Sequence, residues 1–331
     1  MVLYSPAPVE QKPLQLQDVD VPELGQGDIL LRVLACGVCH TDLHTVEGDL
    51  SLPQLPLVPG HQVVGRVEKL GPGSTRFSVG DRVGVTWFGS SCGVCVFCRK
   101  GKENLCPSAR FTGYHRNGGY GEFMAVAEKA AFHIPEVFSD AEATPLLCGG
   151  VIGFRALRLS EVHPGETLGL YGFGNSAHVV IQLAVHMGCH VYVFTRSKTH
   201  QNLALELGAV WAGTAEDEPG AFMDSAIIFA PAGLLVPQAL KRLNKGGTLA
   251  LAGITMTPIP QMEYHLLYGE RTVRSVANTT RLDAEDLLKA AADVPVRTVV
   301  ECFSLEQANE VLRMMKESRL RAGAALVVQE S

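Results

Sequence analysis

Four cysteines crowd into a short stretch of this sequence with the spacing C-x2-C-x2-C-x7-C: Cys92, Cys95, Cys98 and Cys106. Thiolates this close together can surround one tetrahedral zinc ion at about 2.3 Å. Because four protein ligands close the coordination sphere, such a zinc holds a loop together and does no chemistry. The alternatives are four free thiols, or an iron–sulfur cluster, whose ferredoxin-type segment has a shorter last gap.

A glycine-rich turn is the second feature that could do chemistry. The segment LGLYGFGNSAHVVIQLA contains Gly172, Gly174 and Ala177, which form the G-x-G-x-x-A variant of the dinucleotide fingerprint. Gly172 allows the tight turn, Gly174 lets the backbone approach a pyrophosphate, and Ala177 keeps helix and strand close. The start of the helix, at Asn175 and Ser176, would offer N–H groups to the phosphates. The alternative is a turn that binds nothing.

The next predicted strand ends in Thr195, Arg196, Ser197 and Lys198. An NAD site usually has an acidic residue there, about 20 residues after the fingerprint, to accept a hydrogen bond from the ribose 2′-hydroxyl. Two cations and two hydroxyls suit a 2′-phosphate instead, so we expect NADP rather than NAD; the alternative is a pair of solvated charges. The remaining candidate cofactor residues lie at the ends of other predicted strands: Ala230, Gly253 and Ile254.

Two kinds of segment must position these residues. Before Pro145, short alternating runs separated by Gly and Pro turns predict irregular, mostly β structure. After it, predicted strands alternate with predicted helices, which indicates an α/β fold with a doubly wound parallel sheet. The expected strands are Ile29–Leu34, Val63–Lys69, Arg82–Thr86, Thr167–Tyr171, His190–Thr195, Ser225–Ala230, Thr248–Ala252 and Ala324–Val328. The expected helices cover about 176–187, 200–207, 284–292 and 305–317.

The composition is that of an ordinary globular protein. The chain has 331 residues, 47% of them hydrophobic, and a formal net charge of −6. This charge gives no reason to expect binding to nucleic acid or to an anionic membrane. The sequence shows neither a secretory leader nor a long apolar run, so we expect a cytoplasmic protein. The chain has nine cysteines, four of them within fifteen positions, and such crowding in a reducing compartment indicates metal binding rather than disulfides.

Three further motifs complete a family resemblance: Cys36–His44 (CGVCHTDLH), Gly60–Gln62 (GHQ) and Pro145–Gly150 (PLLCGG). With the four-cysteine lobe and the glycine-rich turn, they make the chain closely similar to the zinc-dependent alcohol dehydrogenases of the medium-chain dehydrogenase/reductase family. The resemblance covers essentially the whole chain. It implies a Rossmann (dinucleotide-binding) domain over residues 151–275 and a catalytic domain of the GroES-like type over residues 1–150 and 276–331, with the structural zinc lobe at 92–106.

The resemblance also implies roles for individual residues. Cys39, His61 and Cys148 match the ligands of a catalytic zinc, which would act as a Lewis acid on the oxygen of an alcohol or aldehyde. Asp42 matches the carboxylate that orients the ligand histidine. Proton transfer would run from the alcohol through Thr41 and the cofactor ribose to His44, and His40 matches a contact to the cofactor pyrophosphate. The resemblance thus implies two zinc ions per chain.

One position departs from the family pattern. Relatives usually have Glu after the ligand histidine, and this chain has Gln62. In the family that carboxylate can coordinate the zinc transiently and assist ligand exchange. Gln62 is therefore at most an occasional, weaker ligand, which puts rapid turnover in doubt. Candidate walls of the substrate pocket are Leu50, Trp87 and Phe111, each of which could equally be a core residue.

Several alternatives stay open at this point. The reaction class is hydride transfer between NAD(P) and a small primary or secondary alcohol or aldehyde, and the resemblance implies a homo-oligomer, either a tetramer or a dimer. A zinc-free quinone or enone reductase of the same superfamily would need the dinucleotide site but none of the candidate metal ligands. A catalytically impaired zinc protein is the other possibility, and Gln62 is the one feature that favours it.

Overall fold

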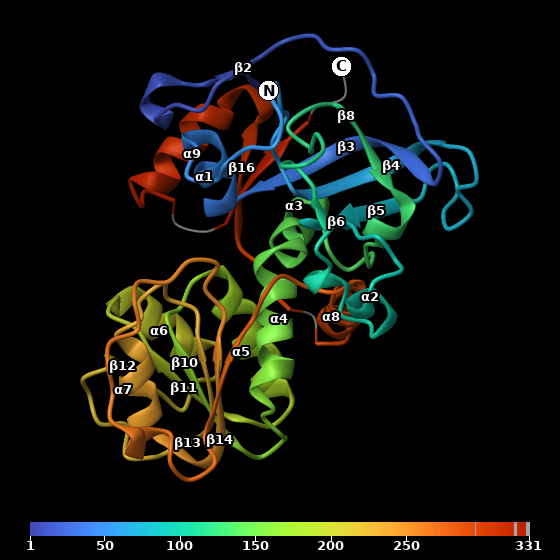
Figure 1. The fold of residues 1–331 in the computed structure, drawn as a ribbon. Helices are drawn as coiled ribbons and strands as arrows, with labels where there is room; N and C mark the ends of the chain where they lie inside the picture. Colours follow the sequence, from blue (N-terminus) through green and yellow to red (C-terminus); the bar gives the residue numbers. More distant parts are fainter. Residues whose placement is uncertain (295, 321–322, 329–331) are drawn as a thin grey trace. The chain divides into compact units, whose positions relative to one another are not determined.

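The computed structural model describes residues 1–294, 296–320 and 323–328. The chain divides into two compact units (Figure 1). Unit 1 consists of Met1–Cys148, Thr280–Ala292 and Arg297–Ser331, and unit 2 consists of Gly149–Thr279 and Asp293–Val296. Among the described residues, no helix combines the length and the apolar character that crossing a membrane requires.

Unit 2 is built around a six-stranded parallel sheet with the order β12-β11-β10-β13-β14-β15. Numbered within this unit, the order is 3-2-1-4-5-6, which is that of the classic dinucleotide-binding fold. Its central strands β10 and β13 are almost fully buried, as expected where helices cover both faces of a sheet. The strands are β10 (Thr167–Tyr171), β11 (His190–Phe194), β12 (Trp211–Gly213), β13 (Met223–Ile228), β14 (Leu243–Leu251) and β15 (Thr272–Ser275).

Four helices belong to the same unit: α4 (Gly149–Ser160), α5 (Asn175–His186), α6 (Lys198–Glu206) and α7 (Leu235–Lys241). Helix α5 follows β10 directly and buries Ala177, Val180 and Ala184 on its inner face. Residues spaced by three and four positions share one face of a helix, so this face is continuous. The doubly wound sheet predicted from the sequence is therefore confirmed.

Unit 1 contains a seven-stranded, mostly antiparallel sheet with the path β16-β17-β3-β4-β5-β9, and β8 also pairs with β3. The long strand β3 is buried on both faces for most of its length and forms the centre of the core. The strands are β3 (Asp28–Val38), β4 (Gln62–Leu70), β5 (Arg82–Val85), β8 (Phe123–Ala127), β9 (Ala131–His133), β16 (Val300–Ser304) and β17 (Gly323–Val327).

Short elements surround this sheet. The helices of unit 1 are α1 (His40–Glu47), α2 (Val96–Arg99), α3 (Asp140–Ala143), α8 (Arg281–Asp293) and α9 (Ala308–Lys316). Two small two-stranded sheets pair β1 (Val2–Leu3) with β2 (Leu14–Gln15) and β6 (Phe88–Ser90) with β7 (Arg110–Phe111). The second small sheet matters for the site, because β6 follows Trp87 and β7 ends at Phe111.

Many elements were absent from the sequence prediction, among them α1, α4, β15 and β16. Helix α4 opens with Gly149 and Gly150, which are poor helix formers that hide a helical pattern. Strand β15 has a charged and two hydroxyl residues among its four, and its pairing with β14 overrides that weak local preference. The predicted helix over 305–317 is a 3-10 turn over Leu305–Gln307 followed by α9.

Candidate functional site

Three side chains that could bind a metal ion converge in unit 1 from distant parts of its sequence. Cys39 precedes α1, His61 precedes β4, and Cys148 follows a 3-10 turn over Thr144–Leu147. The Cys39 Sγ lies 3.3 Å from His61 Nε2 and 4.0 Å from Cys148 Sγ, and His61 Nε2 lies 3.4 Å from Cys148 Sγ. The three donor atoms therefore form a small, nearly regular triangle.

This triangle has the size that zinc requires. For bond lengths of about 2.3 Å to sulfur and about 2.0 Å to nitrogen, tetrahedral geometry places neighbouring donors about 3.5–3.8 Å apart. The observed separations of 3.3, 3.4 and 4.0 Å bracket that range. Two thiolates and one imidazole are also the donor types that zinc prefers. The residues fit the metal that the sequence predicted, and three ligands leave one coordination position for a substrate oxygen.

Asp42 fixes the orientation of the ligand histidine. Its Oδ1 accepts a hydrogen bond from His61 Nδ1 at 3.1 Å, which leaves Nε2 of His61 facing the two cysteines. Its Oδ2 accepts from the backbone N–H of Cys39 at 3.0 Å. Asp42 is 2% exposed, so both bonds are shielded from water. One buried carboxylate thus positions two of the three candidate ligands, as expected of a residue that supports a metal site.

Burial and the close approach of neighbouring groups shift the pKa values of Cys39 and His61. The hydrogen bond to Cys148, together with burial, raises the pKa of Cys39 well above its ordinary value. Burial alone would lower the pKa of His61, but Asp42 and Cys39 raise it well above normal. Both shifts favour the protonated forms of Cys39 and His61. A bound divalent cation would take the place of those protons.

Helix α1 carries the candidate relay residues. Cys39 caps the helix, and its sulfur accepts a hydrogen bond from the Thr41 N–H at 3.3 Å. His44 is partly exposed and its Nδ1 lies 2.7 Å from Asp49 Oδ2, while His40 is exposed at the first helical position. Thr41 and His44 thus lie on one short helix, the first beside the metal ligands and the second in contact with solvent.

An aromatic group stands against the ligand histidine. The Trp87 ring meets His61 edge-on at 5.1 Å between centroids and stacks on Phe111 at 5.2 Å with an interplanar angle of 10°. Tyr114 lies 5.7 Å from Trp87 and its hydroxyl donates to the Ser51 carbonyl at 2.6 Å. Tyr114 was missed from the sequence, although its position three residues after Phe111 was a possible signal. Leu50 lies just beyond α1, where its N–H donates to the His44 carbonyl at 3.4 Å.

Gln62 is buried next to the ligand histidine. It is 4% exposed, and its Nε2 has no hydrogen-bond partner among the described residues. Its side chain packs against Gly37, where an added Cβ would lie 3.0 Å from the Gln62 amide carbon. A buried amide donor without a partner costs about 1–3 kcal/mol.

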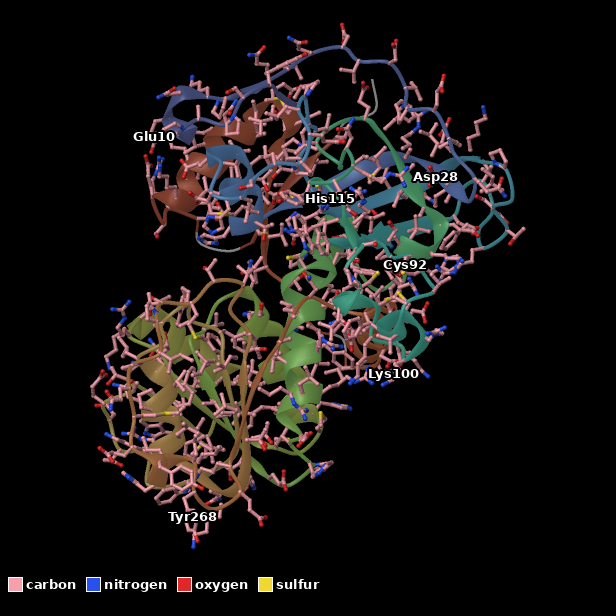
Figure 2. All side chains as sticks on the ribbon, viewed as in Figure 1. Glu10, Asp28, Cys92, Lys100, His115 and Tyr268 are labelled. Atoms are coloured by element: carbon pink, nitrogen blue, oxygen red, sulfur yellow. The ribbon has the colours of Figure 1, made fainter. Side chains whose placement is uncertain are left out.

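The four-cysteine lobe forms a second compact cluster (Figure 2). Sulfur–sulfur distances are 3.5 Å for Cys95–Cys98, 3.5 Å for Cys106–Cys92 and 3.9 Å for Cys92–Cys98. These separations match the edges of a zinc tetrathiolate, which are about 3.8 Å. Backbone N–H groups of Val94 and Cys95 lower the pKa of Cys92 to about 6, which favours the thiolate form that binds metal.

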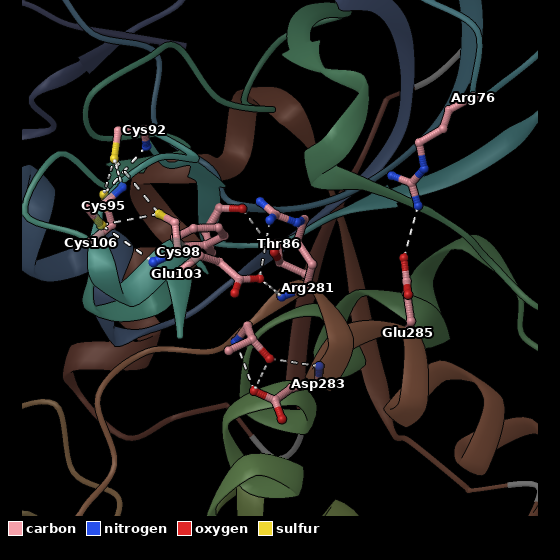
Figure 3. A network of polar contacts seen from close by, with 12 residues as sticks. Arg76, Thr86, Cys92, Cys95, Cys98, Glu103, Cys106, Arg281, Asp283 and Glu285 are labelled. Atoms are coloured by element: carbon pink, nitrogen blue, oxygen red, sulfur yellow. Dashed lines mark hydrogen bonds and ion pairs between the residues drawn. The ribbon is translucent and has the colours of Figure 1, made fainter. Parts of the chain in front are cut away.

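A buried carboxylate links this lobe to helix α8 (Figure 3). Glu103, 5% exposed, accepts a hydrogen bond from the backbone N–H of Arg281 at 3.0 Å and lies 3.6 Å from the Arg281 guanidinium. A carboxylate at the first turn of a helix is stabilised by the free N–H groups there. The same figure shows a more exposed pair farther along α8, between Glu285 and Arg76 at 3.0 Å.

The glycine-rich turn of unit 2 has the predicted strand–turn–helix context. Strand β10 ends at Tyr171, Gly172 turns with φ of 91°, and α5 begins at Asn175. A Cβ on Gly172 would lie 2.9 Å from the Ala230 backbone nitrogen, so this position requires glycine. At Gly174 nothing lies within 4 Å of an added Cβ, which leaves open space in front of the helix start.

The end of β11 holds the second part of the candidate cofactor site. Thr195 follows the strand, and Ser197 caps α6 by accepting from the His200 N–H at 3.3 Å. Arg196 and Lys198 are exposed, and neither has an ion-pair partner among the described residues. Ala230 and Gly253 follow β13 and β14, and Ile254 is 66% exposed. All of these residues lie at the carboxyl ends of parallel strands, where ligands of such sheets bind.

Comparison with known proteins gives the family. The alcohol dehydrogenase GroES-like domain matches residues 25–136, and the zinc-binding dehydrogenase domain matches residues 177–293. A probable alcohol dehydrogenase, AdhA of Mycobacterium tuberculosis, is 44% identical over 98% of this chain and 95% of its own length. The chain belongs to the zinc-type alcohol dehydrogenases of the medium-chain dehydrogenase/reductase family. The resemblance based on sequence motifs is confirmed.

Solved structures of similar dehydrogenases share the whole fold. A cinnamyl alcohol dehydrogenase from Sorghum bicolor has a TM-score of 0.88 and 27% identity, covering 98% of this chain and 97% of its own. A structure described as an NAD-dependent alcohol dehydrogenase has a TM-score of 0.86 and 25% identity, covering 99% of each chain. This alcohol dehydrogenase therefore combines a GroES-like domain with a Rossmann-type domain, as the sequence predicted.

Proposed function

We propose that this alcohol dehydrogenase binds its catalytic zinc through Cys39, His61 and Cys148 and transfers hydride between NADP and a small primary or secondary alcohol or aldehyde. The observation that carries the proposal is the spacing of the three donor atoms, 3.3, 3.4 and 4.0 Å. A zinc ion bound there would act as a Lewis acid on the substrate oxygen. The zinc-free reductase alternative gives no reason for these three side chains to converge.

The chain's own groups have distinct tasks in this proposal. Asp42 holds His61 in the orientation that presents Nε2 to the metal. The Thr41 hydroxyl accepts the alcohol proton, and His44, which is partly exposed, delivers it to solvent. Trp87 and Phe111 form one wall of the substrate pocket, because Trp87 contacts the ligand histidine directly. Leu50 is proposed as a further wall residue, and His40 as a contact to the cofactor pyrophosphate.

A second zinc is proposed in the lobe of four cysteines, held by Cys92, Cys95, Cys98 and Cys106. Their sulfur atoms lie within 4.8 Å of one another. Because this zinc would have four protein ligands, its role is to hold the lobe together. The proposed content is therefore two zinc ions per chain, one structural and one catalytic.

The preference for NADP over NAD rests on the end of strand β11. Gly172, Gly174, Asn175, Ser176 and Ala177 would bind the pyrophosphate at the start of α5, a task that both cofactors share. Thr195, Arg196, Ser197 and Lys198 supply two cations and two hydroxyls where an NAD site has a carboxylate. The described ion pairs do not neutralise these cations. Ala230, Gly253 and Ile254 would line the rest of the cofactor site.

The remaining assignments belong to the same proposal. Unit 1 is the catalytic domain, containing both zinc sites, and unit 2 is the dinucleotide-binding domain. The enzyme works as a homo-oligomer, a tetramer or a dimer. None of its nine cysteines, all of which the structure describes, forms a disulfide, which fits a reducing cytoplasm.

Replacing one ligand tests the zinc assignment. Cys148→Ser should lose about one zinc per chain and about 100-fold or more in kcat/KM while it keeps a cooperative melting transition, since even mutations of residues that only support metal ligands cost about 10- to 100-fold. Cys302→Ser, at an exposed cysteine outside both clusters, is the matched control and should leave both quantities unchanged. Normal zinc content and turnover in Cys148→Ser would refute the ligand set.

A further inference from the structure

The buried side chain of Gln201 connects the residues that follow strand β11. It is 4% exposed, and its Nε2 donates a hydrogen bond to the Thr195 carbonyl at 2.7 Å. Its Oε1 accepts a hydrogen bond from Lys198 Nζ at 2.8 Å. The backbone N–H of Gln201 also donates to the Ser197 carbonyl at 2.9 Å. Gln201 thus touches three of the residues that surround the proposed 2′-phosphate position, two through its side-chain amide and one through its backbone.

These contacts allow only one orientation of the amide. A carbonyl oxygen can only accept, and an ammonium group can only donate, so the Gln201 nitrogen must face Thr195 and its oxygen must face Lys198. Lysine has a flexible four-carbon stem and loses rotamer entropy when it is fixed. Because Gln201 is buried and its amide is held in one orientation, it fixes the Lys198 ammonium before any ligand arrives.

The local charges leave that ammonium available to an anion. The acceptor provided by Gln201 is neutral, so the full positive charge of Lys198 remains. The nearby Asp217 carboxylate attracts Lys198 but forms no ion pair with it among the described residues; one of its oxygens accepts from the Thr214 N–H at 2.7 Å and from the Thr214 hydroxyl at 2.9 Å. Arg196, two residues before Lys198, is exposed and adds a second cation. A glutamate in place of Gln201 would cancel one of these charges.

We propose that Gln201 is a positioning residue for coenzyme choice: it holds Lys198 and the Thr195 backbone in place for the 2′-phosphate of NADP. This inference rests on the proposed preference for NADP. Gln201 acts through its neighbours and is not itself a contact to the phosphate. The proposal therefore concerns the discrimination between two coenzymes and not the hydride transfer.

The test compares two probes that differ only by the 2′-phosphate, 2′,5′-ADP and 5′-AMP, by titration calorimetry on the zinc-loaded enzyme. In Gln201→Met the Kd for 2′,5′-ADP should rise about tenfold, the loss expected when a charge-assisted contact is no longer held in place, while the Kd for 5′-AMP stays unchanged. In Gln201→Glu the rise should be larger. Correspondingly, the KM for NADPH should rise in both variants at constant kcat, and the KM for NADH should not.

Two controls separate this role from a structural one. Gln182→Met makes the same change on α5 and should alter neither probe. Lys198→Met combined with Gln201→Met should lose less than the sum of the two single losses, because Gln201 acts in part through that lysine.

The outcomes are distinguishable. A wild-type enzyme that binds 5′-AMP as tightly as 2′,5′-ADP overturns the NADP preference and the role of Gln201 together. A wild-type enzyme that prefers 2′,5′-ADP, with Gln201 variants that lose affinity for both probes equally or for neither, overturns only the role of Gln201. Fully additive losses in the double variant would also contradict it. A variant that does not fold leaves the decision to the other substitution, since either one alone changes the ratio of the two affinities.

Discussion

At the scale of single residues, the side chain beside the ligand histidine is the most informative. Gln62 is buried with an amide nitrogen that has no partner among the described residues. The family usually has a carboxylate there, which is a better ligand for a dication than a neutral amide. Zinc should therefore still bind to its three ligands, but the exchange of substrate and product at the zinc should be slow.

Gln62→Glu should raise kcat by a few-fold, about two to ten times, because a carboxylate beside the metal can assist ligand exchange. Steady-state oxidation of benzyl alcohol, with zinc content measured on the same sample, checks this. Gln54→Glu adds the same charge at an exposed position and should have no effect. An unchanged kcat in zinc-replete Gln62→Glu would show that Gln62 does not limit turnover.

The motifs in the sequence identified the candidate ligands because zinc needs particular residue types at particular spacings. Cys39 and Asp42 lie three residues apart at the start of one helix. A family motif that contains both residues is therefore enough to predict their roles. Tyr114 and Gln201 were not identified, because their roles depend on contacts made by loops. Gln201 is the fourth residue of α6. Nothing in the sequence distinguishes it from an ordinary helical glutamine until its two hydrogen-bond partners are known.

At the scale of elements, the four-cysteine lobe supports helix α8 through Glu103. The lobe has few apolar contacts of its own, since α2 contains no buried residue. Its shape must then come from the ion that joins the four sulfur atoms. Removing one ligand should affect stability more than chemistry.

Cys98→Ser should lower the melting temperature by about 5 °C or more, because a structural zinc contributes folding free energy directly. Calorimetry or circular dichroism provides the measurement, and Cys302→Ser is the control at an exposed cysteine. The remaining folded enzyme should keep most of its activity at low temperature. A melting temperature equal to that of the wild type would argue against a structural metal.

Glu103→Ala should destabilise the enzyme by about 1–3 kcal/mol, because it leaves the Arg281 N–H and guanidinium without their buried partner. Glu285→Ala removes a carboxylate from the same helix, but its ion pair with Arg76 is exposed, so a loss below about 1 kcal/mol is expected. Urea unfolding of both variants measures the difference. Equal losses would mean that burial of Glu103 contributes nothing.

The elements that the sequence predicted are those with strong local signals. Strands β10 and β11 and helix α5 were predicted within a residue or so because apolar runs and glycine turns mark them. Strands β15 and β16 were missed because their short, mixed sequences gain strand structure only by pairing with β14 and β17. Helix α1 was not predicted, because its many polar residues, which the proposed chemistry requires, leave no clear apolar pattern of helical spacing.

At the scale of the whole molecule, the two units divide the work. Unit 1 gathers both cysteine-containing clusters, and unit 2 carries the glycine-rich turn and the cationic strand end. In the proposed mechanism hydride transfer needs both, because a zinc ion bound in unit 1 would activate the substrate and unit 2 would bind the coenzyme. An enzyme that lacked the catalytic zinc in unit 1, or the coenzyme in unit 2, would be folded but inactive.

The most direct test of this account is the metal content of the purified protein by mass spectrometry, read together with NADPH and NADH oxidation in the presence of benzaldehyde and butanal. The account predicts about two zinc ions per chain, as the two clusters imply, and turnover that is faster with NADPH at low coenzyme concentration. One zinc or none would contradict the assignment of Cys39, His61 and Cys148 or that of the four-cysteine lobe. Two zinc ions without turnover on either coenzyme would contradict the proposed catalysis and point to the impaired enzyme that Gln62 allows.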